Sequence, residues 1–86
     1  MTDPTEWLLK WFEQRGTPVL LPLDQVQTLN YFQAGLLDSF GVIELIGQIE
    51  AYFNIRFEQD NFQDRRFAMI GGLSEIIGEL ATRRNA

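Results

Sequence analysis

Apolar side chains recur with helical spacing in three stretches of the chain, which predicts three main helices. The first covers about residues 4–15, and its apolar positions are Trp7, Leu8, Trp11 and Phe12. The second covers about residues 39–53, and its buried stripe consists of Val42, Leu45, Ile46, Ile49 and Phe53. The third covers about residues 73–83, and its buried positions are Leu73, Ile76, Ile77 and Leu80. We interpret the two tryptophans as core residues rather than as a ligand-binding face.

Capping and turn residues predict where these helices begin and end. Asp3 is a favourable N-cap for the first helix, and Gly16 offers a C-terminal stop. Ser39 lies at the start of the second helix, where its hydroxyl can accept a hydrogen bond from one of the first backbone N–H groups. The pair Gly71-Gly72 predicts a break in the chain before the last helix.

A long connection separates the first two helices. Residues 17–37 contain Pro18, Pro22 and Gly35, and their apolar residues show no sustained period. Because a connection of this length is uncommon unless it packs on the domain, we expect an ordered loop with one or two helical turns over about residues 25–30, capped by Asp24. The residues expected to pack are Leu20, Leu21, Leu23, Val26, Leu29, Tyr31 and Phe32.

A fourth, short helix is expected over about residues 61–67. Asp60 is its predicted cap, and Phe62 and Phe67 are its predicted core-facing residues. Three main helices and one short helix, joined by a long first loop, predict an all-α fold, a small four-helix bundle. Residues 1–86 are expected to form a single domain.

Composition narrows the classes of function. The hydrophobic fraction of 45% and the charged fraction of 22% are those of a globular protein. A net charge of −5, with only seven Lys and Arg, argues against nucleic acid as a partner. We interpret the pair Arg65-Arg66 as solvated surface. No apolar run has the length of a membrane span, and Met1 to Lys10 lacks the pattern of a signal peptide. We therefore expect a cytoplasmic monomer that is not a membrane protein.

The chain contains neither histidine nor cysteine. Histidine performs most acid–base work near neutral pH, and a nucleophilic serine normally needs such a base beside it. Ser39 is therefore not expected to be a hydrolase nucleophile, and the chain is not expected to be an enzyme. Zinc sites built from His and Cys are excluded, and no carboxylate cluster has the spacing of an oxygen-ligand metal site.

Ser39 has two interpretations from the residues alone. It can be only a helix cap, or it can carry a phosphate, because the unpaired N–H groups and the helix dipole favour an anion at this end. The outward side of the helix is predicted to hold Gly41, Glu44, Gln48 and Ala51, with Gly47 beside them and Phe40 and Ile43 near Ser39. Gly41 and Gly47 either provide a thin surface or relieve crowding against a neighbouring segment.

The run Phe32-x-x-Gly35-Leu36-Leu37-Asp38-Ser39-Phe40, followed by Val42, Ile43, Glu44, Leu45 and Ile46, resembles the attachment site of acyl carrier and peptidyl carrier proteins. Helix order and loop lengths extend the resemblance over nearly the whole chain. It implies that Ser39 is joined through a phosphodiester to 4′-phosphopantetheine, donated by coenzyme A under a phosphopantetheinyl transferase. The thiol at the end of this arm would carry acyl or aminoacyl groups as thioesters.

The resemblance also implies partners and their contacts. Asp38 matches the acidic residue that assists the transferase. Acyl- or aminoacyl-loading ligases and downstream synthase or transferase enzymes would read the helix that follows Ser39, and the expected partner-binding residues are Phe40, Ile43, Glu44 and Gly47.

One departure from the family concerns charge. Only Glu44 and Glu50 are charged between Ser39 and Phe53, whereas fatty-acid-synthase carriers present a strongly acidic helix. Apolar contact should therefore matter more than electrostatic steering, and the chain looks closer to stand-alone D-alanyl, peptidyl or specialised acyl carriers.

Three questions stay open. The cargo and the pathway are not defined by the sequence. A long acyl cargo either enters the bundle near Leu45, Ile46 and Ile76 or does not. The alternative function is an unmodified interaction module of the same fold, in which Ser39 is only a cap.

Overall fold

Five α-helices and one 3₁₀-helix make up the secondary structure of residues 3–84, the part of the chain that the computed structural model describes. The elements are α1 (Pro4–Gln14), α2 (Leu23–Val26), α3 (Ser39–Phe53), α4 (Gln59–Gln63), the 3₁₀-helix η1 (Arg65–Ala68) and α5 (Ile70–Arg84). These residues contain no strand, so the all-α prediction is confirmed. Residues 1–2 and 85–86, which the expected domain includes, lie outside the described residues.

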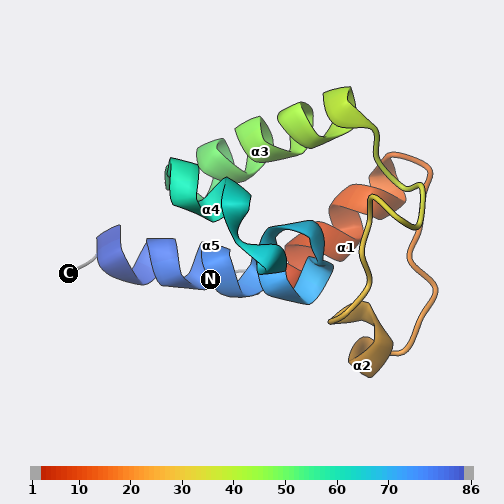
Figure 1. Cartoon of the computed structure of the whole chain (residues 1–86). Helices are drawn as coiled ribbons and strands as arrows, with labels where there is room; N and C mark the ends of the chain where they lie inside the picture. Colours follow the sequence, from red (N-terminus) through yellow and green to blue (C-terminus); the bar gives the residue numbers. More distant parts are fainter. Residues whose placement is uncertain (1–2, 85–86) are drawn as a thin grey trace.

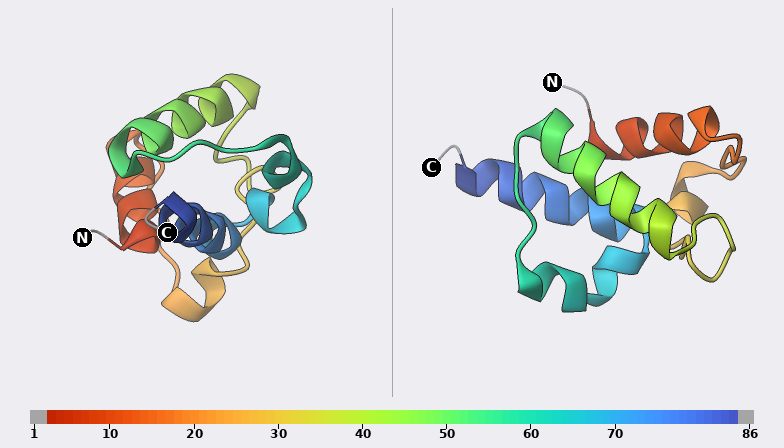
Figure 2. Two further views of the ribbon diagram at one scale, coloured as in Figure 1. Left: turned by 90° about the vertical axis from the view of Figure 1, so that its left-hand side faces the viewer. Right: turned by 90° about the horizontal axis from the view of Figure 1, so that it is seen from above.

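The three long helices enclose the core. Figures 1 and 2 show that α3 runs opposite to α1 and in the same direction as α5. The predicted stripes of α1 and α5 are buried, with Trp7 only partly so. In α3, Val42, Leu45 and Ile49 are buried, while Ile46 and Phe53 are half-buried. The side chains buried most completely on these helices are Leu8, Phe12, Leu45, Ile49, Ile70, Leu73, Ile76 and Ile77.

The ends of α1 follow from local chemistry. The carboxylate of Asp3 accepts a hydrogen bond from the N–H of Thr5 at 3.4 Å, which confirms the predicted cap. Gly16 has φ +87°, and the N–H of Thr17 donates to the carbonyl of Phe12 at 3.0 Å. This hydrogen bond spans the left-handed glycine in the manner of a Schellman motif, so Gly16 ends the helix as predicted.

The expected break at Gly71-Gly72 is wrong, because both glycines lie in the first turn of α5. A Cβ on Gly71 would lie 2.6 Å from the backbone of Gln27, and a Cβ on Gly72 would lie 2.2 Å from the carbonyl oxygen of Arg66. Two other segments therefore pack directly on the backbone of this turn. The glycines are required for close approach rather than for a turn.

The long loop is ordered because it is held against the start of α5. The N–H of Gly71 donates to the carbonyl of Gln27 at 3.2 Å, and the N–H of Ile70 donates to the carbonyl of Leu29 at 3.1 Å. Tyr31 is completely buried, and its hydroxyl donates to the carbonyl of Phe67. Burial also raises the pKa of the Tyr31 phenol. The loop is thus a fixed part of the fold.

Predictions for side chains within this loop are only partly right. Val26 and Tyr31 are buried and Leu29 packs against the core, as expected. The others are exposed, contrary to expectation, and they are Leu20, Leu21, Leu23 and Phe32. The helical turn also lies earlier than predicted, over Leu23–Val26, and its N-cap is Pro22 rather than Asp24.

The short helix expected over 61–67 is divided into α4 and η1. The division falls at Asp64, whose backbone is extended and whose carboxylate accepts from the N–H of Arg66 at 2.9 Å. Asp60 is not the cap, because α4 begins at Gln59 after Glu58. Phe67 is buried as predicted, whereas Phe62 is 47% exposed. Phe62 covers the outer side of the Phe67 ring, with the ring centres 5.2 Å apart.

Arg66 connects η1 to α5 through a cluster of carboxylates. Its guanidinium lies 2.9 Å from Asp64, 3.3 Å from Glu75 and 2.7 Å from Glu79. Hydrogen bonds from Arg66 hold the pKa values of Asp64 and Glu79 below their usual range. Arg66 is therefore not the freely solvated charge that the sequence suggested.

Candidate functional site

The start of α3 is capped by Asp38 and not by Ser39. Asp38 has an extended backbone, with φ −99° and ψ −174°, and its carboxylate accepts from the N–H of Gly41 at 2.8 Å. Ser39 is the first residue of the helix itself, so of its two interpretations the one in which its hydroxyl caps the helix is wrong. The two residues are adjacent and both are good caps. The backbone conformation at Asp38 decides between them.

Ser39 is exposed at the positive end of a fifteen-residue helix. The N–H groups of Ser39 and Phe40 belong to the first turn, where no intrahelical acceptor exists. Together with the helix dipole, these groups favour negative charge close to the Ser39 oxygen. The structure therefore leaves the hydroxyl accessible in an environment that suits a phosphate.

Gly41 is buried, contrary to the prediction that it faces outward. A Cβ at this position would lie 2.9 Å from a methyl group of Leu37 and 3.3 Å from the guanidinium of Arg15. Leu37 is itself a core residue that lies directly before the capping Asp38. Gly41 therefore relieves crowding, which was one of its two interpretations. The close approach of Leu37 to Gly41 fixes how the loop enters α3.

The turn before the site is also fixed. The side-chain oxygen of Asn30 accepts from the N–H groups of Phe32 and Gln33, each at 3.0 Å. Gly35 has φ +74°, and the N–H of Leu36 donates to the carbonyl of Tyr31 at 3.0 Å. The conformation at Gly35 favours glycine, and it directs Leu36 and the residues after it toward the helix start.

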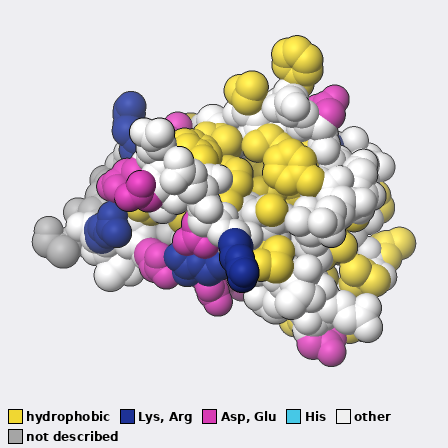
Figure 3. Space-filling model, viewed as in Figure 1, with side chains coloured by type: hydrophobic (Ala, Val, Ile, Leu, Met, Phe, Trp, Pro, Cys, Tyr) yellow, Lys and Arg dark blue, Asp and Glu magenta, His cyan; other side chains and the backbone are white. Residues whose placement is uncertain are grey.

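Phe40, Ile43 and Gly47 form a surface that we call the outer face of α3. Phe40 is 83% exposed and Ile43 is 68% exposed. Gly47 is exposed, and a Cβ added there would meet no atom within 4 Å, so Gly47 leaves this surface thin without relieving crowding. In Figure 3, hydrophobic side chains protrude above α3 along the upper edge of the molecule.

Glu44, the fourth predicted partner-binding residue, is bound to α1. Its carboxylate accepts from the guanidinium of Arg15 at 2.8 Å and from the amide of Gln48 at 3.3 Å. The amide oxygen of Gln48 accepts from the indole N–H of Trp11 at 2.8 Å, and Arg15 lies 4.8 Å from the centre of the Trp11 ring. The four side chains form a closed network, so the charge of Glu44 is balanced within the chain.

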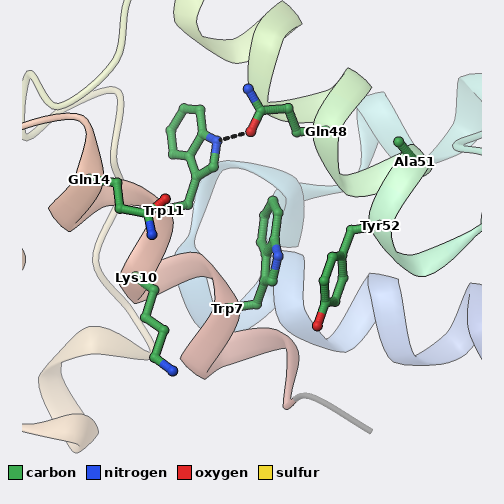
Figure 4. A pocket seen from close by; sticks show the side chains of 7 residues that line it. All are labelled: Trp7, Lys10, Trp11, Gln14, Gln48, Ala51 and Tyr52. Atoms are coloured by element: carbon green, nitrogen blue, oxygen red, sulfur yellow. Dashed lines mark hydrogen bonds between the residues drawn. The ribbon is translucent and has the colours of Figure 1, made fainter.

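A groove between α1 and α3 was not predicted from the sequence. It has a volume of about 500 Å³, and its walls include Trp7, Trp11 and Tyr52. Figure 4 shows Trp7 facing Tyr52 across the groove, while Trp11 points toward Gln48. Trp11 is therefore a core residue as predicted, but Trp7 also lines a surface. The i, i+4 spacing of the tryptophans was the available signal, since it places both on one side of α1.

Comparisons with protein-family models, with curated proteins and with solved structures found no match to the chain. Within residues 3–84, no helix has both the length and the apolar character needed to cross a membrane.

Proposed function

We propose that the chain is a carrier protein, which holds acyl or aminoacyl groups as thioesters on a 4′-phosphopantetheine arm attached to Ser39. One observation carries the proposal. Asp38 caps α3, and the hydroxyl of Ser39 is therefore left exposed at the helix start. A hydroxyl that was needed as a cap would be a poor place for a covalent arm.

The surroundings of Ser39 fit a phosphodiester. The helix dipole and the N–H groups of the first turn stabilise a negative charge on the attached phosphate. The chain has no cysteine, so a thioester requires a thiol from elsewhere, which 4′-phosphopantetheine supplies. The hydroxyl of Ser39 provides the oxygen that joins the arm to the chain.

Neighbouring residues have separate roles in this proposal. Asp38 holds the first turn and assists the transferase. Phe40, Ile43 and Gly47 contact the transferase, the loading ligase and the enzymes that receive the cargo. Because Glu44 is already paired with Arg15, its carboxylate contributes less to these contacts than the two apolar side chains. We also propose that the chain has the helical bundle of an acyl carrier protein and that it is located in the cytoplasm.

Intact mass spectrometry tests the attachment. The purified chain is incubated with coenzyme A, magnesium and a transferase of broad specificity. The expected result is a gain of one 4′-phosphopantetheine by the wild type and no gain by Ser39→Ala. Ser74→Ala is the matched control, because Ser74 is the only other serine in the sequence and its partly buried hydroxyl accepts a hydrogen bond from Thr5. An unchanged mass of the wild type, while a known carrier is modified in the same mixture, would contradict the proposal.

A further inference from the structure

An apolar hollow is formed by residues of the long first loop, which connects α1 to α3. It has a volume of about 310 Å³ and is lined by the side chains of residues 18–21, 29, 34 and 36. These side chains are all apolar, because the lining residues are proline, valine, leucine and alanine. The hollow is separate from the groove between α1 and α3.

The hollow has a fixed floor and an exposed rim. Val19, Leu29 and Leu36 pack against the core, and Leu29 and Leu36 also take part in backbone hydrogen bonds to Ile70 and Tyr31. At the rim, Leu20 is 86% exposed and Leu21 is 42% exposed. The floor is therefore formed before any ligand binds, and the rim presents leucine side chains that an apolar group can cover.

The proposed attachment point lies within reach of the hollow. Leu36 precedes Ser39 by three residues, so their Cα atoms are no more than about 11 Å apart. About 14 bonds separate the Ser39 oxygen from the sulfur of a 4′-phosphopantetheine arm, which corresponds to roughly 17 Å in an extended form. Because the extended arm is longer than this separation, a thioester at its end can reach the part of the hollow that Leu36 lines.

We infer that this hollow binds the cargo of the arm, and that the cargo is an apolar acyl group of medium length. The inference rests on the proposed function and adds the class of cargo to it. At about 30 Å³ for each water-sized group, the volume of about 310 Å³ accommodates roughly ten such groups at most, which matches a chain of about eight to ten carbons better than a long fatty acyl chain. An aminoacyl cargo fits the hollow less well, because all the lining side chains are apolar and none of them can pair with an ammonium group.

The core between the helices is a less suitable site for the same cargo. Leu45 and Ile76 have at most 1% of their surface exposed, and both belong to the hydrophobic core cluster. An acyl chain that entered between the helices would have to displace side chains from a close-packed core. The hollow needs no such displacement, since its rim is open to solvent.

The test compares three forms of the chain by methyl NMR, with the arm alone, with an acetyl-arm and with an octanoyl-arm. Intact mass first establishes that each arm is attached, and failure at this step would contradict the proposed function. With the arms attached, the octanoyl form is expected to shift the methyl resonances of Val19, Leu21, Leu29 and Leu36, and the acetyl form is not. Shifts at Leu45, Ile46 and Ile76 in their place, or no shift with any acyl group, would overturn the inference alone.

A matched pair of variants gives a second readout. Leu21→Gln places an amide at the rim, and Leu23→Gln is the control, since Leu23 is exposed but does not line the hollow. Hydroxylamine is expected to cleave the octanoyl thioester roughly fourfold faster in Leu21→Gln than in the wild type, the factor that corresponds to about one methylene returned to water. The Leu23→Gln rate should equal that of the wild type. Equal rates in all three proteins would contradict binding in the hollow, as would methyl shifts that appear only when a partner enzyme is added.

Discussion

The helices α3 and α5 begin in opposite ways, although both have glycine in their first turn. At α5, the turn is covered on two sides, because the backbones of Gln27 and Arg66 lie where side chains of Gly71 and Gly72 would be. At α3, the turn is covered only on the side of Gly41, and Ser39 and Phe40 face solvent.

The two helix starts differ in whether other segments cover them. Every helix start has a positive dipole end and N–H groups without an intrahelical acceptor, which favour an anion. At α5, however, the N–H groups of Ile70 and Gly71 already donate to the carbonyls of Leu29 and Gln27. The start of α5 cannot accept one, because the loop and η1 occupy the space beside its backbone. We therefore regard the start of α5 as a structural joint, whereas the start of α3 is open to the modification and recognition that we propose.

The largest expected effect comes from filling the joint at α5. Gly71→Ala forces the loop at Gln27 away from the helix, and we expect a loss of about 3 kcal/mol in the free energy of unfolding. Gly78→Ala is the control, because it lies in the same helix with no atom within 4 Å of the added Cβ, and it should stabilise the fold by up to about 1 kcal/mol. Urea unfolding measures both. Equal stability of the two variants would mean that the loop is not held as described.

The next effect concerns the outer face of α3. Phe40→Ala is expected to weaken binding to the loading enzyme about tenfold, because a large exposed aromatic side chain is the typical anchor of an interface. Glu44→Gln should change affinity less, since its charge is balanced by Arg15. Phe62→Ala, a change at an exposed phenylalanine on α4, is the control and should bind normally. Titration calorimetry would contradict the account if Glu44→Gln had the larger effect.

Two substitutions of Asp38 distinguish its role as the helix cap from its proposed role in assisting the transferase. Asp38→Ala should lower stability by about 1 kcal/mol, whereas Asp38→Asn should keep most of it, because asparagine caps helices as well as aspartate does. If the negative charge assists the transferase, both variants will be modified more slowly than the wild type. A normal rate of modification for Asp38→Asn would restrict Asp38 to capping.

The smallest expected effect comes from Arg66, which stabilises the start of α5 through its ion pairs with Asp64, Glu75 and Glu79. The pKa values of Asp64 and Glu79 are lowered in the folded chain, so their carboxylates stabilise the fold at neutral pH. This contribution is lost as the pH falls through the folded-state pKa values. Arg66→Gln should therefore lower the Tm above about pH 5 and have less effect below about pH 3. The neighbouring change Arg65→Gln should leave the pH dependence of the Tm unchanged, and a similar change in both variants would argue against the cluster.

The long helices could be predicted because their apolar stripes are long and strongly periodic. The bounds of α3 agree with the prediction at both ends, and the buried positions of α5 agree as well. The identity of the α3 cap could not be predicted, because Asp38 and Ser39 are adjacent and equally suitable. Only the backbone conformation at Asp38, which directly follows the buried Leu37, distinguishes them.

The predictions that are wrong concern places where segments far apart in the sequence are in contact. Gly71-Gly72 has the local pattern of a helix break, and only the contact with Gln27, more than forty residues away, shows why a helix there needs glycine. The exposure of Leu20 and Leu21 is similar in origin, because the loop is held through Leu29 against α5 and through Tyr31 against η1. Local spacing carries no information on such contacts, and for the same reason it could not predict the hollow.

The most direct test of the central claim is the mass of the chain as it occurs in the organism that encodes it. The protein is isolated from that organism without overexpression, and its intact mass and the peptide that contains Ser39 are analysed. A covalent 4′-phosphopantetheine is expected on Ser39 in at least part of the population. A chain with the mass of its sequence alone, recovered under conditions that preserve the arm on a known carrier from the same cells, would contradict it.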